Sequence, residues 1–217
     1  GWSDAAVNFH PLFIAAIAVG VQVSAAVGAS PQWPQFRGPG GLGVAADDAH
    51  PPIQFGPGTN VAWRVSAPSG NSSPVIWNER VFLTGYAEGA LVTLAYDRAT
   101  GRELWRREVR PEKVEEVHSS LGNPATATPV TDGERLYVHF GSFGMLAYDL
   151  DGRELWRRPM KLTQTEYGAS SSPVLAGGHV VQLLDQDGDS HLVALNPRTG
   201  EVVWRVERQE MRRGFGT

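Results

Sequence analysis

The chain has 217 residues and no cysteine, so disulfides contribute nothing to its stability. Its formal net charge of -4 gives no electrostatic reason to expect a nucleic-acid partner. Hydrophobic residues make up 41% of the chain, enough for a packed core, and 25 glycines with 15 prolines indicate a fold rich in turns.

Residues 1–29 have the composition of an export signal. An apolar run at residues 12–21 is followed by small residues, a pattern typical of a secretory signal peptide cleaved after about Ala29. The run is too short for a comfortable transmembrane span, and an uncleaved membrane anchor is the alternative. We therefore expect an exported protein, periplasmic or extracellular, without a membrane span in the mature chain if the segment is cleaved.

Residues 30–58 are rich in proline and glycine. Because proline cannot donate a hydrogen bond to a β-ladder, we expect this segment to lie extended across the surface of the folded domain. Residues 60–65 follow, and they look like the last strand of a unit that lacks the three strands before it.

A unit of about 45 residues that ends in Gly-x-x-x-Trp occurs three times in residues 59–217. The copies occupy residues 73–106, 128–157 and 172–205. Each copy accommodates four short strands separated by turn residues, which predicts a four-stranded antiparallel meander. In the third copy the strands are expected at residues 173–176, 179–185, 191–195 and 202–206.

The tryptophan at the end of each unit determines how the sheets pack. Successive side chains point to opposite faces of a strand, so Leu104 and Trp105, and their counterparts, place an apolar group on each face. A sheet that is apolar on both faces is covered on both sides. Radial stacking of such sheets makes an all-β fold, a β-propeller of four-stranded antiparallel blades, with a β-sandwich as the alternative. The residues expected to dock the blades are Trp63, Trp105, Trp156, Trp204, Gly101, Gly152 and Gly200.

Arginine and glutamate surround each of these tryptophans, as Glu103 and Arg106 do in the first copy. Mixed charges of this kind predict a solvated outer edge that discourages pairing with other strands. Three blades and one orphan strand do not close a ring, because propellers have about four to eight blades. We therefore expect residues 59–217 to be a partial propeller, a fragment in which the orphan strand completes the final blade.

The Ala-x-Asp-x-x-Thr-Gly-x-x-x-Trp run of residues 95–105, its shortened form at 147–156 and residues 194–204 resemble the pyrroloquinoline quinone (PQQ)-like propeller repeat. The WPQFRGP run of residues 33–39 is similar to the start of many exported bacterial proteins that carry this repeat. The resemblance implies the propeller fold but does not fix the function, since one fold serves many tasks.

Relatives with this repeat imply two functions. One is a non-catalytic binding or scaffold module that holds a protein or small-molecule partner on its rims, as in a β-barrel assembly lipoprotein. The alternative is a quinoprotein dehydrogenase, in which PQQ and calcium lie on the axis and oxidise an alcohol or a sugar. Such enzymes often stack the quinone on a vicinal disulfide, which a chain without cysteine lacks. We favour the binding module, assign no catalytic residue, and keep PQQ and calcium as candidate cofactors.

The loops that join one blade to the next lie at the mouth of a propeller axis, where binding residues gather. Here they are residues 110–127, 161–171 and 207–217. His118 and Ser119 are not expected to form a nucleophilic pair, because adjacent loop residues rarely face each other and no nearby aspartate orients the ring. The candidate rim and axial binding residues are His118, Ser119, Asn123, Tyr167 and Arg213.

A metal site is a further hypothesis at Asp185, Asp187 and Asp189. Carboxylates at alternate positions can converge on Ca²⁺ where the chain turns tightly. The EF-hand pattern is not met, because Asn196 stands where the bidentate glutamate is expected. The alternative is a hairpin turn at Asp187 and Gly188 with the carboxylates in solvent.

Overall fold

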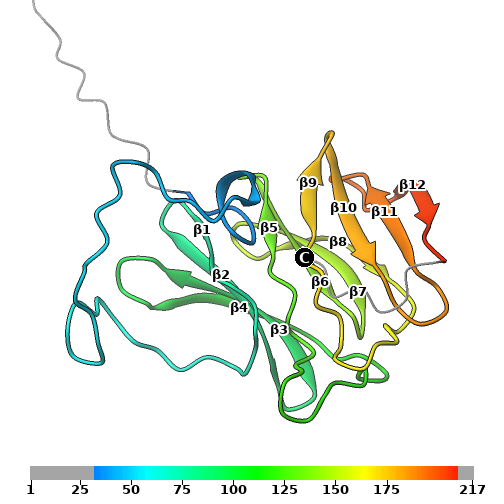
Figure 1. Cartoon of the computed structure of the whole chain (residues 1–217), viewed down its shortest axis with the longest axis horizontal. Helices are drawn as coiled ribbons and strands as arrows, with labels where there is room; N and C mark the ends of the chain where they lie inside the picture. Colours follow the sequence, from blue (N-terminus) through cyan, green and yellow to red (C-terminus); the bar gives the residue numbers. More distant parts are fainter. Residues whose placement is uncertain (1–31, 210–217) are drawn as a thin grey trace, which may run out of the picture.

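Three four-stranded antiparallel sheets make up the fold in residues 32–209, the part of the chain that the structure, a computed structural model, describes. Each sheet is a meander, and the first strands of neighbouring sheets lie next to each other (Figure 1). Blade 1 contains β1 (Val75–Trp77), β2 (Arg80–Ala87), β3 (Ala90–Asp97) and β4 (Glu103–Val109). Blade 2 contains β5 (Val130–Thr131), β6 (Arg135–Phe140), β7 (Gly144–Asp149) and β8 (Glu154–Pro159). Blade 3 contains β9 (Val174–Ala176), β10 (His179–Leu184), β11 (His191–Leu195) and β12 (Val202–Glu207).

The all-β propeller prediction is confirmed. In blade 3 every strand begins and ends within one residue of its predicted bounds. The turns lie at the predicted glycines, and Gly177, Gly178 and Gly188 all adopt positive φ, which glycine does without steric cost. Outside the strands, the described residues contain one short 3-10 turn, η1 (Pro39–Gly41).

The last strand of each blade contains a β-bulge, which the sequence does not predict. The ladder shifts register next to the tryptophan, so Leu104, Leu155 and Val203 have no direct partner on the neighbouring strand. Leu155 is 38% exposed and Val203 is 49% exposed, whereas Leu104 packs on the core between blades 1 and 2. The prediction that the residue before each tryptophan covers the opposite face of the sheet is therefore wrong. Leu104 packs in the same cluster as Trp105, and Leu155 and Val203 are partly exposed, because the bulge breaks the alternation on which the prediction depends.

Blade 2 is nevertheless apolar on both faces. Leu136 and Val138 of β6 pack into one core cluster with Phe82 of blade 1. Their neighbour Tyr137 points the other way and packs into a second cluster with Val180 of blade 3. Adjacent strand residues thus fill two different blade interfaces, as the stacking argument requires.

The tryptophans dock each blade on the next through a repeated contact. The ring of Trp105 lies on Gly152, where an added Cβ would be 2.6 Å from the ring, and its Nε1–H donates to the Leu150 carbonyl at 2.9 Å. The same arrangement joins Trp63 to Gly101 and the Arg98 carbonyl, and Trp156 to Gly200 and the Pro197 carbonyl. All three glycines have positive φ, so both the backbone conformation and the close ring require glycine.

Trp63 makes this contact without belonging to a strand. Residues 61–65 have no ladder partner within residues 32–209, so the orphan segment is held by its indole and not by a sheet. At the other end, Trp204 is 37% exposed, and the described residues supply no glycine turn for its ring.

The segment before Trp63 crosses the first strands of two blades. Trp33 forms a bridge with Ile76 of β1, and the Pro34 carbonyl accepts a hydrogen bond from the Thr131 N–H of β5 at 2.9 Å. The chain then turns at Gly38, which has a φ of 70° and lies against the Trp33 ring. Residues 33 and 34 therefore tie blades 1 and 2 together on their inner edges (Figure 1).

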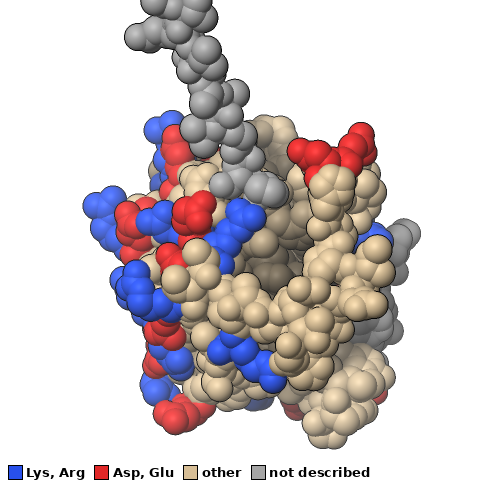
Figure 2. All heavy atoms as spheres, turned by 90° about the vertical axis from the view of Figure 1, so that its left-hand side faces the viewer, with Lys and Arg blue, Asp and Glu red and all other residues tan. Residues whose placement is uncertain are grey.

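The outer strands carry mixed charges. Ion pairs join Arg106 to Glu108 on β4 and Arg157 to Glu154 on β8. On the face shown in Figure 2, charged side chains of both signs gather along one flank, and the centre of that face is hollowed. Within residues 32–209 no helix is long and apolar enough to cross a membrane. The predicted signal segment, residues 1–29, lies outside the described residues.

Candidate functional site

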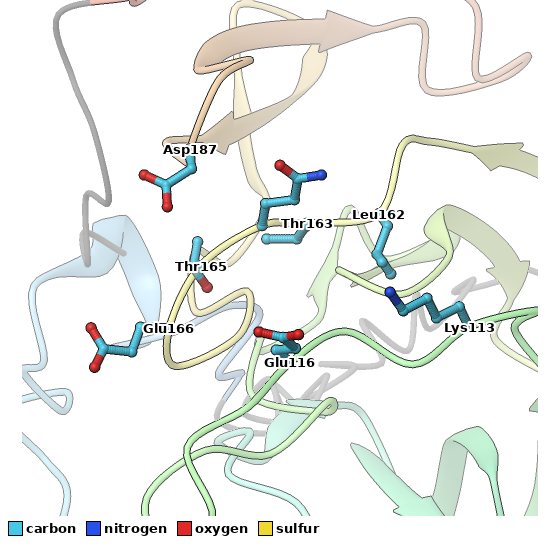
Figure 3. Close-up of a pocket in the computed structure, with 8 residues that line it drawn as sticks. Lys113, Glu116, Leu162, Thr163, Thr165, Glu166 and Asp187 are labelled. Carbon is cyan, nitrogen blue, oxygen red and sulfur yellow. The ribbon is translucent and has the colours of Figure 1, made fainter.

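Two inter-blade loops and one hairpin enclose an open hollow of about 520 Å³. The first loop joins β4 to β5, the second joins β8 to β9, and the hairpin joins β10 to β11. Figure 3 shows Lys113 and Glu116 on the first loop, Thr165 and Glu166 on the second, and Asp187 on the hairpin. The residues that line the hollow are Lys113, Glu116, Leu162, Thr163, Gln164, Thr165, Glu166 and Asp187. The wall is thus polar, with three carboxylates and one ammonium group.

A buried carboxylate holds the two loops together. Glu115 is 3% exposed; its Oε2 accepts a hydrogen bond from the Ala169 N–H at 2.9 Å, and its own N–H donates to Ser142 Oγ at 3.0 Å. A side chain at Gly141 would overlap the carboxylate, so this approach needs glycine. Burial raises the pKa of Glu115 to about 7, and the hydrogen bonds from Ala169 and Ser142 oppose that rise.

The structure brings two of the predicted rim residues into contact. The rings of His118 and Tyr167, which come from different loops, stack with centroids 5.3 Å apart and an interplanar angle of 21°. The Oγ of Ser120 lies 3.2 Å from His118 Nδ1. Tyr167 and Leu121, which follows His118 in the first loop, are both exposed. The stacked pair lies beside the polar hollow, since Tyr167 directly follows the lining residue Glu166.

The other predicted rim residues have different surroundings. Ser119 is exposed and is not the serine beside the imidazole, because Ser120 takes that place. Asn123 is buried; its Oδ1 accepts from the Ala125 N–H at 2.8 Å and its Nδ2 donates to Ser69 Oγ at 3.1 Å. Asn123 therefore shapes the loop from within. Arg213 lies outside the described residues.

The three aspartates of the metal hypothesis do not converge. Asp185 receives two hydrogen bonds from Arg208, at 2.8 and 3.1 Å. Asp189 pairs with Arg205 and lies 3.5 Å from Lys161 Nζ, while Asp187 lines the hollow. No group of three or more acidic or histidine side chains within residues 32–209 could hold a metal ion. The three aspartates thus do not share a metal site in this arrangement, and Gly188 makes the hairpin turn of the alternative interpretation.

Sequence reasoning placed Glu115 in a rim loop without assigning it a role. Its burial depends on Ala169, Ser142 and the space at Gly141, which belong to other segments of the chain. The stack of His118 on Tyr167 likewise depends on how two loops meet. Neither contact has a local sequence signal.

Comparisons with known proteins support the fold and a family. A family model described as outer membrane protein assembly factor BamB matches residues 54–214. The protein of that name from Kangiella koreensis is 30% identical over 138 residues, which are 63% of this chain and 32% of the relative. The corresponding protein from Bordetella pertussis is 26% identical over 170 residues, or 75% of this chain and 38% of the relative. The chain therefore spans about a third of the length of these relatives.

Quinone-dependent enzymes are also similar to the chain. The 1-butanol dehydrogenase (quinone) of Thauera butanivorans is 36% identical over 98 residues, which are 42% of this chain and 15% of the enzyme. A solved europium-containing methanol dehydrogenase has a TM-score of 0.56 and 15% identity, over 67% of this chain and 26% of that one. At that identity the structural likeness concerns the fold alone.

Proposed function

The chain belongs to the outer membrane protein assembly factor BamB family, and on that premise we propose that it is a non-catalytic propeller that binds protein partners during outer membrane protein assembly. Such a role places it outside the cytoplasm, in agreement with the export signal expected at residues 1–29. Its surface carries the function, because blade interfaces are filled by apolar side chains and docked tryptophans.

The contact between His118 and Tyr167 carries the proposal. It presents stacked rings, half in solvent, between two loops and beside a hollow with both charge signs. Aromatic side chains bordered by polar groups are typical of the residues that contribute most to protein–protein binding. Glu115 fixes the two loops relative to each other from below, so the rim is formed before a partner arrives.

The test uses the full-length protein in its own bacterium after deletion of the chromosomal gene. Tyr167→Ala and His118→Ala are expected to weaken capture of the outer membrane assembly machinery about tenfold, the loss for a contact worth about 1.4 kcal/mol. The readouts are the amount of machinery that copurifies, identified by mass spectrometry, and the fraction of outer membrane β-barrels that is folded. Arg153→Ala, an exposed change in the β7–β8 turn, is the control. Equal capture by all variants would contradict the proposed rim.

A quinoprotein dehydrogenase is the second candidate, favoured by the similarity to the butanol enzyme. It needs PQQ and calcium, for which residues 32–209 offer no group of metal ligands. The purified full-length protein, incubated with PQQ and Ca²⁺, is assayed for dye reduction with alcohols and sugars. Reduction that depends on PQQ would replace the scaffold proposal with this one.

A further inference from the structure

Two fully buried polar side chains lie on facing strands of blades 2 and 3. His139 of β6 is 2% exposed and Gln182 of β10 is 0% exposed. His139 is two residues from Tyr137 on the same face, and Gln182 lies between Val180 and Leu184, which pack with Tyr137 in one cluster. His139 Nδ1 and Gln182 Oε1 have no hydrogen-bond partner within the described chain. Buried polar atoms are rarely left in this condition.

Both side chains use the same backbone carbonyl. Gln182 Nε2 donates to the Ser171 carbonyl at 3.0 Å and to the Leu183 carbonyl at 2.8 Å, which fixes the orientation of its amide. His139 also forms a hydrogen bond with the backbone of Ser171, and this bond favours the protonated ring. The acceptor is therefore the carbonyl. Since Nδ1 has no partner, the nitrogen that donates to Ser171 is Nε2.

The free nitrogen of His139 is an acceptor. Burial lowers the pKa of His139 to about 4, so the ring is neutral near pH 7 and carries one proton. That proton is on Nε2, where it meets the Ser171 carbonyl. Nδ1 then holds a lone pair that needs a donor.

A small cavity adjoins this ring. Its volume is about 10 Å³, and His139, Ala169, Ser170 and Ser171 are among the residues that line it. A cavity of roughly 10–15 Å³ is the smallest that holds one water molecule. Thr163 also lines the larger hollow, so the cavity lies directly behind the wall of that hollow.

Blade 1 shows why blade 2 differs. Val75 pairs with Phe82 in blade 1 as Val130 pairs with Tyr137 in blade 2, so Thr84 is the counterpart of His139. The Thr84 hydroxyl donates to the Ala127 carbonyl at 3.2 Å, so its single donor is satisfied by that hydrogen bond. His139 makes the same inter-blade hydrogen bond with one ring nitrogen, and its second nitrogen has no partner within the described residues.

We propose that the cavity binds a single ordered water molecule, which donates one hydrogen to His139 Nδ1. Gln182 is not among the residues that line the cavity, so its Oε1 is not assigned to this water. The water supports the wall of the hollow from behind, since a buried water that meets several polar groups is part of the structure.

A high-resolution crystal structure of the protein tests this. We expect a density peak about 2.7–3.2 Å from His139 Nδ1 and none in contact with Thr84 Oγ1. Nitrogen-15 NMR of the imidazole in solution is expected to show the proton on Nε2 and a hydrogen-bonded, unprotonated Nδ1. A cavity without density, or a ring with its proton on Nδ1, would overturn the proposal.

His139→Thr is the matched variant, because it gives blade 2 the residue of blade 1. It is expected to keep the bond to the Ser171 carbonyl and to lose the water peak beside residue 139. A peak that keeps its place and occupancy in the variant would show that Nδ1 does not hold the water. Should the variant fail to fold, the measurements on the unchanged protein decide the question.

Discussion

Glu115 is a single residue with a measurable consequence for stability. The pKa of a free glutamate is 4.5, and burial raises that of Glu115 to about 7 in the folded protein. Between these values the folded state binds more protons than the unfolded state, so this residue lowers the free energy of unfolding as pH rises. This loss of stability is complete above about pH 7, and the free energy of unfolding falls by at most on the order of 3 kcal/mol.

Glu115→Gln removes this dependence. Glutamine keeps an acceptor for the Ala169 N–H and has no charge to desolvate, so the variant is expected to be more stable than the parent at pH 8 by about 1–3 kcal/mol. At pH 4 the two proteins should have nearly the same stability. Urea unfolding at both pH values measures the difference. Glu116→Gln, at the exposed neighbour in the hollow, is the control, and an equal pH response in Glu115→Gln and the parent would refute the argument.

At the scale of the strand, the β-bulge separates two adjacent residues with opposite roles. Trp156 is buried on Gly200, whereas Leu155 is at the bulge and partly in solvent. Trp156→Ala should cost about 3–5 kcal/mol, as for other large-to-small core changes, and Leu155→Ala less than about 1 kcal/mol. Denaturant unfolding of both variants gives the comparison. Similar costs would contradict the docking role of the indole.

The repeat explains which elements the sequence could predict. Each strand of blade 3 follows from apolar runs and glycine turns, and the docking tryptophans follow from their position after Gly101, Gly152 and Gly200. The exposure of Leu155 could not be predicted, because a bulge depends on the pairing register and not on composition. The burial of Glu115 could not be predicted either, because it depends on a contact with Ala169, which lies more than fifty residues further along the chain.

For the candidate site, sequence reasoning identified the loops but not their geometry. His118 and Tyr167 were predicted as separate rim residues, and their stacking shows that the two loops meet. Ser119 was a candidate rim residue and is exposed, whereas Ser120, which was not a candidate, lies 3.2 Å from His118 Nδ1 through its Oγ. The aspartates at 185 and 189 were candidate ligands, but arginines from β12 and the residues after it bind them.

At the scale of the molecule, the outer faces of blades 1 and 3 are covered differently within residues 32–209. The outer face of blade 1 is a cluster that includes Val92 and Leu94, and Trp63 packs on it. Blade 3 has no such cover within residues 32–209, and Val174, Trp204 and Val206 are exposed. An exposed apolar sheet face favours association, since an open array of repeats needs a polar cap.

The 217-residue polypeptide is therefore expected to self-associate through blade 3 as its concentration rises. A double change, Trp204→Arg with Val206→Lys, places charges on the exposed strand β12 and should weaken association at least about tenfold, which corresponds to about 1.4 kcal/mol. Sedimentation velocity over a range of concentrations measures the effect. Ile53→Arg replaces another exposed apolar side chain, outside the blades, and should leave association unchanged. A polypeptide that stays monomeric at every concentration would contradict the prediction that the exposed face of blade 3 drives association.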